Sequence, residues 1–266
     1  MIGPLPYVGG KRRLAPLLLS LIPPHITYVE AFAGGAQLFF HKPRSEVEIL
    51  NDLDSEVVNF HRVCQRHPQE IVRLLRHQPA SRQLFNELDR LDPAALTDCE
   101  RAARFLYLQK NSWGGRRARH NFHYSVTKPP NYRPAFLKER IRLAAERLAE
   151  AQIENQPYQE ILARYDRAST FFYLDPPYVG VDLYAHNFTD DQFGDLARRL
   201  AGLQGRFLLS INDCEKARAW FAGFHCREVE LTYTAIKRPR VFRELLFSNY
   251  PLPSLALTPA HKVSGH

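Results

Sequence analysis

The sequence predicts an α/β fold: a mostly parallel, Rossmann-like sheet with helices on both faces, and a mainly helical insertion. A glycine-rich turn joins a strand to a helix near the amino end. A second strand, which ends in an acid, follows about twenty residues later, the separation typical of doubly wound folds. Helices and strands alternate again after residue 189. In such folds the strand tips form a ligand-binding edge, so we expect the site there.

The first predicted element is a helix over residues 14–21, where four leucines share one face. A Gly-Gly turn precedes it, and Lys11 follows Gly10 directly. Two interpretations of Lys11 stay open. It is either a cation that meets a carboxylate of a ligand, with Tyr7 against an adenine ring, or a solvated lysine in a basic run.

Residues 27–32 predict a strand, and the segment Ala33-Gly34-Gly35-Ala36 predicts a tight turn into a helix over residues 37–40. Glycines let a ligand approach the backbone closely. The next predicted strand, residues 47–50, ends in Asn51-Asp52. An acid at this strand tip binds the ribose of nucleoside cofactors, which is the role we expect for Asp52. A cap or turn is the alternative, and Asp54 competes for the role.

Helices are predicted over residues 55–66, 68–77, 81–91 and 97–110, the last with a capping box of Thr97 and Glu100. Residues 112–135 lack helical periodicity and gather basic and amide side chains. Arginine pairs with guanine and asparagine with adenine in the major groove, so this segment is the candidate DNA-reading hairpin or loop. A solvated loop is the alternative. The candidate DNA contacts are Arg116, Arg117, Arg119, Asn121 and Lys128.

Asp175-Pro176-Pro177-Tyr178 follows the apolar run of residues 170–174, which predicts a strand buried on both faces. The prolines end the strand and leave the acid at its carboxyl edge. The carboxylate and the carbonyl of Pro176 suit the two hydrogens of an exocyclic amine on a nucleobase, whose lone pair they would aim at an electrophilic methyl group. Tyr178 would stack on a base rotated out of the duplex. An ordinary proline-containing turn is the alternative.

The remaining elements alternate: a helix over residues 189–200 with a capping box of Thr189 and Gln192, a strand over 206–211, a helix over 215–221, and strands over 226–231 and 242–249. Residues 210–213 either line a base pocket or cap the next helix. Lys237, Arg238 and Arg240 lie close to the start of the last strand, where they would clamp DNA phosphates; a charged hairpin tip is the alternative.

The composition agrees with one catalytic domain that meets a polyanion. Lys and Arg total 36 against 28 Asp and Glu, a formal net charge of +8, and 45% of the residues are hydrophobic. The four cysteines are scattered without ligand spacing, so we expect reduced thiols, no metal and a cytoplasmic location. We find no signal peptide and no apolar run long enough for a membrane span.

Four motifs together resemble the Dam-like DNA adenine-N6 methyltransferases that use S-adenosylmethionine. They are the Tyr7 to Lys11 opening, the Glu30 to Gly34 segment, the Asn51-Asp52 pair and the Asp-Pro-Pro-Tyr box, in this order. The resemblance implies a class I methyltransferase sheet and direct in-line transfer to N6 of a flipped adenine in double-stranded DNA. It implies cofactor contacts from Tyr7, Gly10, Lys11, Glu30, Phe32, Gly34, Gly35, Asp52 and Asp175, and catalytic roles for Asp175, Pro176, Pro177 and Tyr178.

We therefore expect a catalytic, cofactor-binding domain over residues 1–54 and 136–251, an inserted helical and hairpin target-recognition region over 55–135, and a flexible tail over 252–266. Two departures from relatives are Ala36, where a glycine is common, and the polar residues of 109–115, so no target sequence can be transferred. The alternatives are an RNA adenine or DNA cytosine-N4 methyltransferase, a non-catalytic DNA-binding regulator and a dinucleotide oxidoreductase. We expect a bacterial or phage-encoded protein. The oligomeric state on DNA and the role in restriction-modification, in a phage or in gene regulation stay open.

Overall fold

A computed structural model describes residues 3–7, 11, 13–112, 121–124, 126–127, 129–182, 184–233 and 240–253, with the backbone alone at 231–233 and 240–242. The strands are β1 (Thr27–Glu30), β2 (Val47–Asn51), β3 (Gln152–Glu154), β4 (Thr170–Leu174), β5 (Arg206–Asn212), β6 (His225–Tyr233) and β7 (Arg240–Ser248). The helices are α1 (Ala15–Leu21), α2 (Gln37–His41), α3 (Ser55–Arg66), α4 (Pro68–Leu75), α5 (Arg82–Arg90), α6 (Asp98–Asn111), α7 (Leu137–Leu148), α8 (Tyr158–Tyr165), α9 (Asp190–Ala201) and α10 (Glu215–Trp220). Two short 3₁₀ turns, η1 (Pro93–Ala95) and η3 (Pro134–Phe136), complete the described elements.

The described strands form one seven-stranded sheet in the order β3-β2-β1-β4-β5-β7-β6. Neighbouring strands from β3 to β5 are parallel, whereas β7 runs antiparallel to both β5 and β6. The strand order reverses between β1 and β4, and a doubly wound sheet binds its ligand at such a switch point. The predicted Rossmann-like α/β fold is therefore confirmed.

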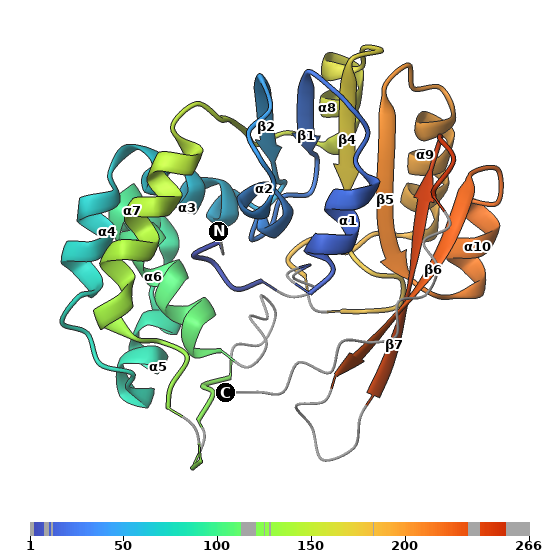
Figure 1. The fold of residues 1–266 in the computed structure, drawn as a ribbon. Helices are drawn as coiled ribbons and strands as arrows, with labels where there is room; N and C mark the ends of the chain where they lie inside the picture. Colours follow the sequence, from blue (N-terminus) through green and yellow to red (C-terminus); the bar gives the residue numbers. More distant parts are fainter. Residues whose placement is uncertain are drawn as a thin grey trace.

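Side chains of the central strands alternate between two apolar cores, one on each face of the sheet. Tyr28, Phe171 and Tyr173 belong to the core that contains α1, α2, α3, α6 and α7. Val29 and Phe172 belong to the core beneath α8, α9 and α10. Figure 1 shows α9 and α10 behind the sheet and α1 in front of it. Because successive residues of a strand point to opposite faces, a strand covered on both sides needs an uninterrupted apolar sequence, as β4 has.

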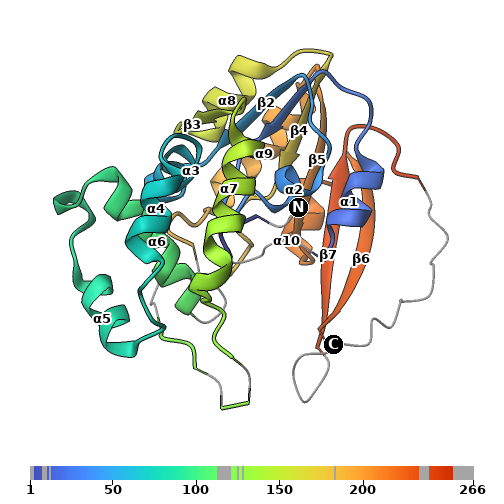
Figure 2. The same ribbon diagram turned by 60° about the vertical axis from the view of Figure 1, so that its left-hand side comes forward.

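The helices between β2 and β3 form a lobe beside the sheet, visible at the left of Figure 1 and again in Figure 2. Helix α6 packs against α3, α4 and α5, and α7 packs against α3 and α4. The predicted capping box at the start of α6 is present, with Thr97 and Glu100 each accepting from the other's backbone. The capping box of Thr189 and Gln192 at α9 is present as well. No helix in the described part of the chain is long and apolar enough to cross a membrane.

The observed elements differ from the predicted ones in a few places. Strand β1 ends at Glu30, two residues before the predicted end, because the chain leaves the sheet for the glycine turn. Elements α7, β3 and α8, which lie between residues 136 and 169, were not predicted. Within the predicted DNA-reading segment, Ser112 and Phe122 form an isolated antiparallel bridge, which fits the chain reversal expected there.

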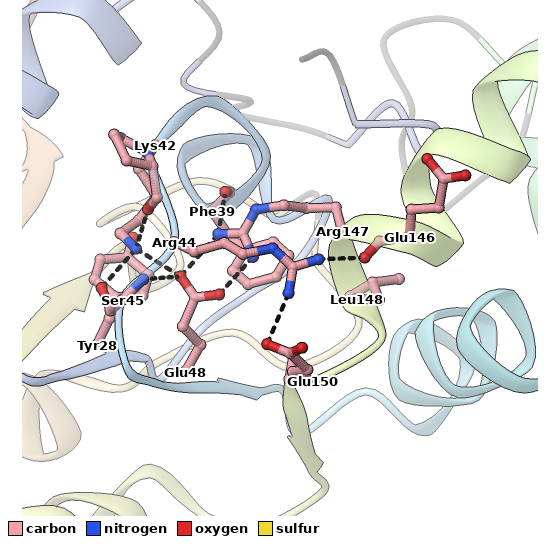
Figure 3. A network of polar contacts seen from close by, with 12 residues as sticks. Tyr28, Phe39, Lys42, Arg44, Ser45, Glu48, Glu146, Arg147, Leu148 and Glu150 are labelled. Atoms are coloured by element: carbon pink, nitrogen blue, oxygen red, sulfur yellow. Dashed lines mark hydrogen bonds and ion pairs between the residues drawn. The ribbon is translucent and has the colours of Figure 1, made fainter.

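A buried charge network ties α7 to strand β2 (Figure 3). Glu48 of β2 accepts from Lys42 Nζ at 2.6 Å and from a terminal guanidinium nitrogen of Arg147 at 2.7 Å. Arg147 also donates to the carbonyl of Phe39 at 3.0 Å and lies 3.7 Å from the centre of the Phe39 ring. The side chains of Lys42, Glu48 and Arg147 are each at most 10% exposed. Glu48 thus links β2, the loop after α2, and α7 through one carboxylate.

Candidate active site

A cavity of about 310 Å³ opens at the carboxyl ends of β1, β2 and β4, on the switch point of the sheet. Its volume falls at the lower end of the range for small-molecule sites, about 300–1,000 Å³. The aromatic and aliphatic part of its wall comes from Tyr7, Phe32, Leu53, Pro157, Tyr158 and Phe188. Its ionisable side chains include Lys11, Glu30, Asp52, Asp54 and Asp175.

The glycine turn shapes one wall of this cavity. Gly34 has a φ of +48°, and a Cβ placed on it would meet a ring carbon of Tyr7 at 2.8 Å. Both the left-handed backbone and the contact with Tyr7 therefore require glycine. Ala36 also has a positive φ, +47°, a conformation in which a non-glycine residue carries local backbone strain. This places the departure from the usual glycine at a position where glycine would be less strained.

Asp52 and Asp54 have different roles, which separates the two candidates for the strand-tip acid. Asp52 lines the cavity, and its carboxylate accepts from the backbone N–H of Gly34 at 2.8 Å and of Asp54 at 2.9 Å. Asp54 caps helix α3 by accepting from the N–H of Glu56 at 3.0 Å. The cap interpretation therefore applies to Asp54, whereas Asp52 fixes the glycine turn and the cavity wall together.

Glu30, at the end of β1, is a buried acid in the same cavity. Burial raises its pKa to about 7, although hydrogen bonds from the Tyr28 hydroxyl and the Phe39 N–H, both 2.7 Å long, act in the opposite direction. The Phe39 contact ties the end of β1 to helix α2, across the glycine turn.

The Asp-Pro-Pro-Tyr segment follows β4 and meets two residues from distant parts of the chain. Asp175 Oδ1 lies 3.0 Å from Lys11 Nζ. The Tyr178 hydroxyl donates to Glu244 Oε1 at 2.6 Å and accepts from Lys11 Nζ, which lies 4.6 Å from the centre of the Tyr178 ring. Burial raises the pKa of Asp175 to about 6, although Lys11 opposes the rise. Lys11 is itself buried; burial alone would lower its pKa, but the Asp175 and Glu244 carboxylates raise it above its ordinary value.

Strand β5 supports the Asp-Pro-Pro-Tyr segment from the side. Ser210 Oγ lies 3.3 Å from Asp175 Oδ1 and 3.0 Å from the Tyr173 hydroxyl. The Asn212 side chain accepts from the N–H of Val179 at 2.9 Å and donates to its carbonyl at 3.2 Å. Cys214, and neither Asn212 nor Asp213, caps helix α10. Ser210 and Asn212 therefore hold the Asp-Pro-Pro-Tyr segment and the residue after it in place.

The structure gathers most of the predicted cofactor residues around one cavity. The cavity is lined by Tyr7, Lys11, Glu30, Phe32, Gly34, Gly35, Asp52, Asp175 and Pro177. Pro176 is buried, and Tyr178 lies beside Lys11. The solvated-lysine interpretation of Lys11 is wrong, because the side chain is buried among carboxylates. Sequence reasoning missed Glu244, Gln156, Pro157, Tyr158, Tyr184 and Phe188, which no motif marks.

Most of the predicted DNA contacts fall outside the described residues. These are Arg116, Arg117, Arg119, Lys128, Lys237 and Arg238, together with Gly10 of the cofactor set and the side chain of Arg240. Asn121 is described and exposed. Among the described residues, no group of three or more His, Cys, Asp or Glu side chains is placed to hold a metal ion.

The strand order, the reversed β7 and the Asp-Pro-Pro-Tyr segment after β4 define a class I methyltransferase. The sequence profile of the D12 class N6 adenine-specific DNA methyltransferases matches residues 7–235. The chain belongs to this family, which confirms the predicted class: an enzyme that methylates DNA at the N6 amine of adenine.

Three relatives are similar to the chain over nearly their whole length. A type II methyltransferase, M1.LlaDCHI of Lactococcus lactis subsp. cremoris, is 26% identical over 92% of this chain and 94% of its own. The type II methyltransferase M.CviBI of Paramecium bursaria Chlorella virus NC1A is 25% identical over 85% of this chain and 89% of its own. A DNA adenine methylase of Serratia marcescens is 27% identical over 82% of this chain and 86% of its own.

Proposed function

We propose that the chain transfers a methyl group from S-adenosylmethionine to adenine N6 in duplex DNA, with the target base rotated out of the helix into the space beside Asp175. The proposal rests on one observation: the cavity and the Asp-Pro-Pro-Tyr segment lie side by side at the switch point of the sheet. The cavity at the tips of β1 and β2 lies where doubly wound folds bind a nucleoside, and the Asp-Pro-Pro-Tyr segment borders it. A cofactor and an amine acceptor would therefore meet at Asp175.

The charges of the cavity fit a cationic cofactor. Four carboxyl groups, those of Glu30, Asp52, Asp54 and Asp175, face it together with one lysine, which is already paired with Asp175. S-adenosylmethionine supplies a methyl group on a positively charged sulfonium, so an excess of acids favours its binding. The phosphates of a dinucleotide would meet the same acids unfavourably, which argues against the oxidoreductase alternative.

The residues that would hold this cofactor lie on different walls. Asp52, which lines the cavity at the tip of β2, would bind the ribose hydroxyls. Phe32, Leu53, Pro157 and Tyr158 offer an apolar wall for the adenine ring. Gly34 and Gly35 leave no side chain between the turn and its neighbours. A Cβ on Gly35 would meet the carbonyl oxygen of Leu5 at 2.7 Å. Tyr7 and Lys11 close the side next to Asp175.

The acceptor chemistry follows from the Asp-Pro-Pro-Tyr segment. The Asp175 carboxylate accepts one hydrogen of the adenine amine, the Pro176 carbonyl accepts the other, and Pro177 keeps that backbone rigid. These contacts direct the nitrogen lone pair away from the ring, and the proton released from N6 passes to Asp175. The ring of Tyr178 stacks on the extrahelical base, a contact of about 1–3 kcal/mol.

We also propose that different parts of the chain carry out catalysis and DNA recognition. Residues 1–54 and 136–251 form the catalytic part, and residues 55–135 read the DNA through the segment after α6, with phosphate contacts from residues 237–240. The net charge of +8 supports a polyanionic partner. The cytoplasmic location and the bacterial or phage origin stay predictions.

The experiment that tests this function starts from the purified chain, S-adenosylmethionine and unmethylated duplex DNA. Digestion to nucleosides and mass spectrometry should reveal N6-methyladenine. Controls with S-adenosylhomocysteine in place of the cofactor and with RNA in place of DNA should give no modified base. N4-methylcytosine or methylated RNA as the main product would contradict the proposed acceptor.

Asp52→Ala is expected to weaken cofactor binding. The substitution removes the predicted ribose contact and the two backbone hydrogen bonds that hold the glycine turn. Hydrogen bonds to a charged group contribute about 1.5–3 kcal/mol each, so we expect a rise of about tenfold or more in the Kd for S-adenosylhomocysteine, measured by calorimetry. Asp98→Asn, at an exposed acid of α6, is the matched control and should bind normally. An unchanged Kd for Asp52→Ala would remove Asp52 from the cofactor site.

Methyl transfer is expected to lose rate on the acidic side of neutrality. Asp175 must be ionised to accept the amine hydrogen, and its pKa is raised to about 6. The value of kcat/KM, which reports the pKa of the free enzyme, should therefore fall tenfold for each pH step of one well below that value. Steady-state kinetics at a series of pH values check this. A rate that stays constant down to the ordinary value of 3.8 would contradict it.

A further inference from the structure

Glu244 lies on β7, far from every motif of the sequence, but on the face of the sheet that carries the catalytic segment. It is opposite Asn212 of β5, whose side chain holds the backbone of Val179. Residues two apart on a strand share a face, so Glu244 lies on the side of Leu246, which belongs to the same core as Tyr173. The residue is 7% exposed.

One oxygen of Glu244 holds two groups of the site at once. Glu244 Oε1 accepts from the Tyr178 hydroxyl at 2.6 Å and lies 3.4 Å from Lys11 Nζ. Lys11 Nζ is in turn 3.0 Å from Asp175 Oδ1. The lysine thus lies between two carboxylates, and the tyrosine ring is fixed from its hydroxyl end.

The other oxygen of Glu244 argues against a purely structural role. Oε2 is buried and accepts no hydrogen bond from the residues that the structure describes. A buried carboxylate oxygen without a partner carries a desolvation cost, and an apolar side chain at this place would avoid it. A buried polar atom of this kind calls for an explanation, and a role in the active site supplies one.

We propose, on the basis of the function proposed above, that Glu244 is a positioning residue for methyl transfer: it fixes the ring of Tyr178 and shares the charge of Lys11, so that Asp175 keeps its affinity for the amine proton. Without Glu244, Lys11 would pair with Asp175 alone and the Asp175 carboxylate would be a weaker base. Asp175, Lys11 and Glu244 together carry one net negative charge, which also suits a cationic cofactor nearby.

The electrostatics agree with this role. Glu244 raises the pKa of Asp175, although less than burial does, while Lys11 lowers it. The ionisable groups that face Asp175 come from several elements: Lys11 from the amino-terminal segment, Glu30 from β1, Tyr173 from β4, Tyr178 and Tyr184 from the loop after β4, and Glu244 from β7. Replacing Glu244 by a neutral residue should therefore change the pKa of Asp175 without altering the sequence of the Asp-Pro-Pro-Tyr segment.

The test compares Glu244→Gln with Glu230→Gln, an exposed acid of the same hairpin that pairs with Arg243 at 3.0 Å. We expect Glu244→Gln to lower kcat by about tenfold or more, because misplacement of reacting groups carries penalties of up to a hundredfold, while the KM for DNA changes less than threefold. The acidic limb of its pH profile should move to lower pH, because a neutral amide no longer raises the pKa of Asp175. Glu230→Gln should match the wild type in both.

Tyr178→Phe supplies an independent second variant, since it removes the hydrogen bond from the Tyr178 hydroxyl to Glu244 but keeps the ring. The double variant should lose less than the product of the two single losses, because both act through one contact. If Glu244→Gln does not fold, Tyr178→Phe alone must lower kcat with normal S-adenosylhomocysteine binding.

Two results would overturn the inference. In the first, Glu244→Gln has the kcat of the wild type and an unchanged acidic limb of its pH profile. In the second, its kcat and its Tm are both lower, but the acidic limb of its pH profile does not move. Failure of the proposed function looks different, because the wild-type chain would then form no N6-methyladenine at all. A wild-type enzyme that methylates DNA, with an unaffected Glu244→Gln variant, would remove the role of Glu244 and leave the function intact.

Discussion

Asp175→Asn is expected to reduce kcat about a thousandfold. Losing one electrostatic contact in an active site typically costs about a hundredfold to a thousandfold, and we expect the upper end of that range here. The amide keeps the size of the side chain but removes the negative charge. It also turns a donor towards the hydrogens of the adenine amine. Lys11 keeps Glu244 and Tyr178 as partners, so the buried lysine is not left without a counter-charge. The fold should therefore survive.

Single-turnover methylation at saturating cofactor and DNA, together with thermal unfolding, measures this effect. Asp190→Asn, at an exposed acid of α9 that pairs with Lys216, is the control and should keep full activity. Binding of S-adenosylhomocysteine to Asp175→Asn should be reduced far less than kcat. A variant that retains more than a tenth of the wild-type rate would refute the assignment of Asp175 as the group that orients the amine.

Glu48→Ala should lower the free energy of unfolding by about 3–5 kcal/mol, the usual loss when one partner of a buried ion pair is removed. Lys42 and Arg147 would remain buried beside an empty carboxylate site (Figure 3). The exposed pair of Arg44 with Glu150 is the matched comparison in the same region. Glu150→Ala should lower the free energy by less than about 1 kcal/mol.

The stabilisation by Glu48 should depend on pH with a definite sign. Burial alone would raise the pKa of Glu48, but hydrogen bonds from Arg147 and Lys42 lower it below its ordinary value of 4.5 in the folded state. The contribution is therefore complete at neutral pH and is lost as the pH falls below 4.5 through the folded value. Urea unfolding of wild type and Glu48→Ala at several pH values should give curves that converge in acid. A difference that stays constant would exclude the carboxylate as its source.

Local signals predicted much of this fold. The starts of α6 and α9 could be predicted from their capping boxes, because the hydrogen bonds of a capping box join residues within four positions of each other. The strand tip at Asp175 was predictable because two prolines interrupt the sheet there, and the tip at Asp52 because polar residues follow a short apolar run. The separate roles of Asp52 and Asp54 were not, since both are acids after a strand and only the three-dimensional path shows which one reaches Gly34.

The unpredicted parts depend on contacts between distant residues. Strand β3 has only three residues, too few for a periodic pattern, and it pairs with β2 across about a hundred intervening residues. Glu244 follows Arg243 in β7 and so belongs to a charged pair, where an acid is usually solvated. Its burial follows from the placement of β7 inside the sheet, between β5 and β6, and from the approach of Lys11. No local pattern contains that information.

The meeting of Lys11, Tyr178 and Glu244 also bears on how the enzyme folds. The contacts of Lys11 with Tyr178 and with Glu244 span 167 and 233 residues along the chain. Contacts of such high order form slowly, since most of the chain must be ordered before they close. Helices α3 to α7 contact one another over shorter stretches of sequence and can form earlier. During refolding, helical signal would thus return before methylation activity, and an incompletely folded chain would have no assembled catalytic centre with which to modify DNA.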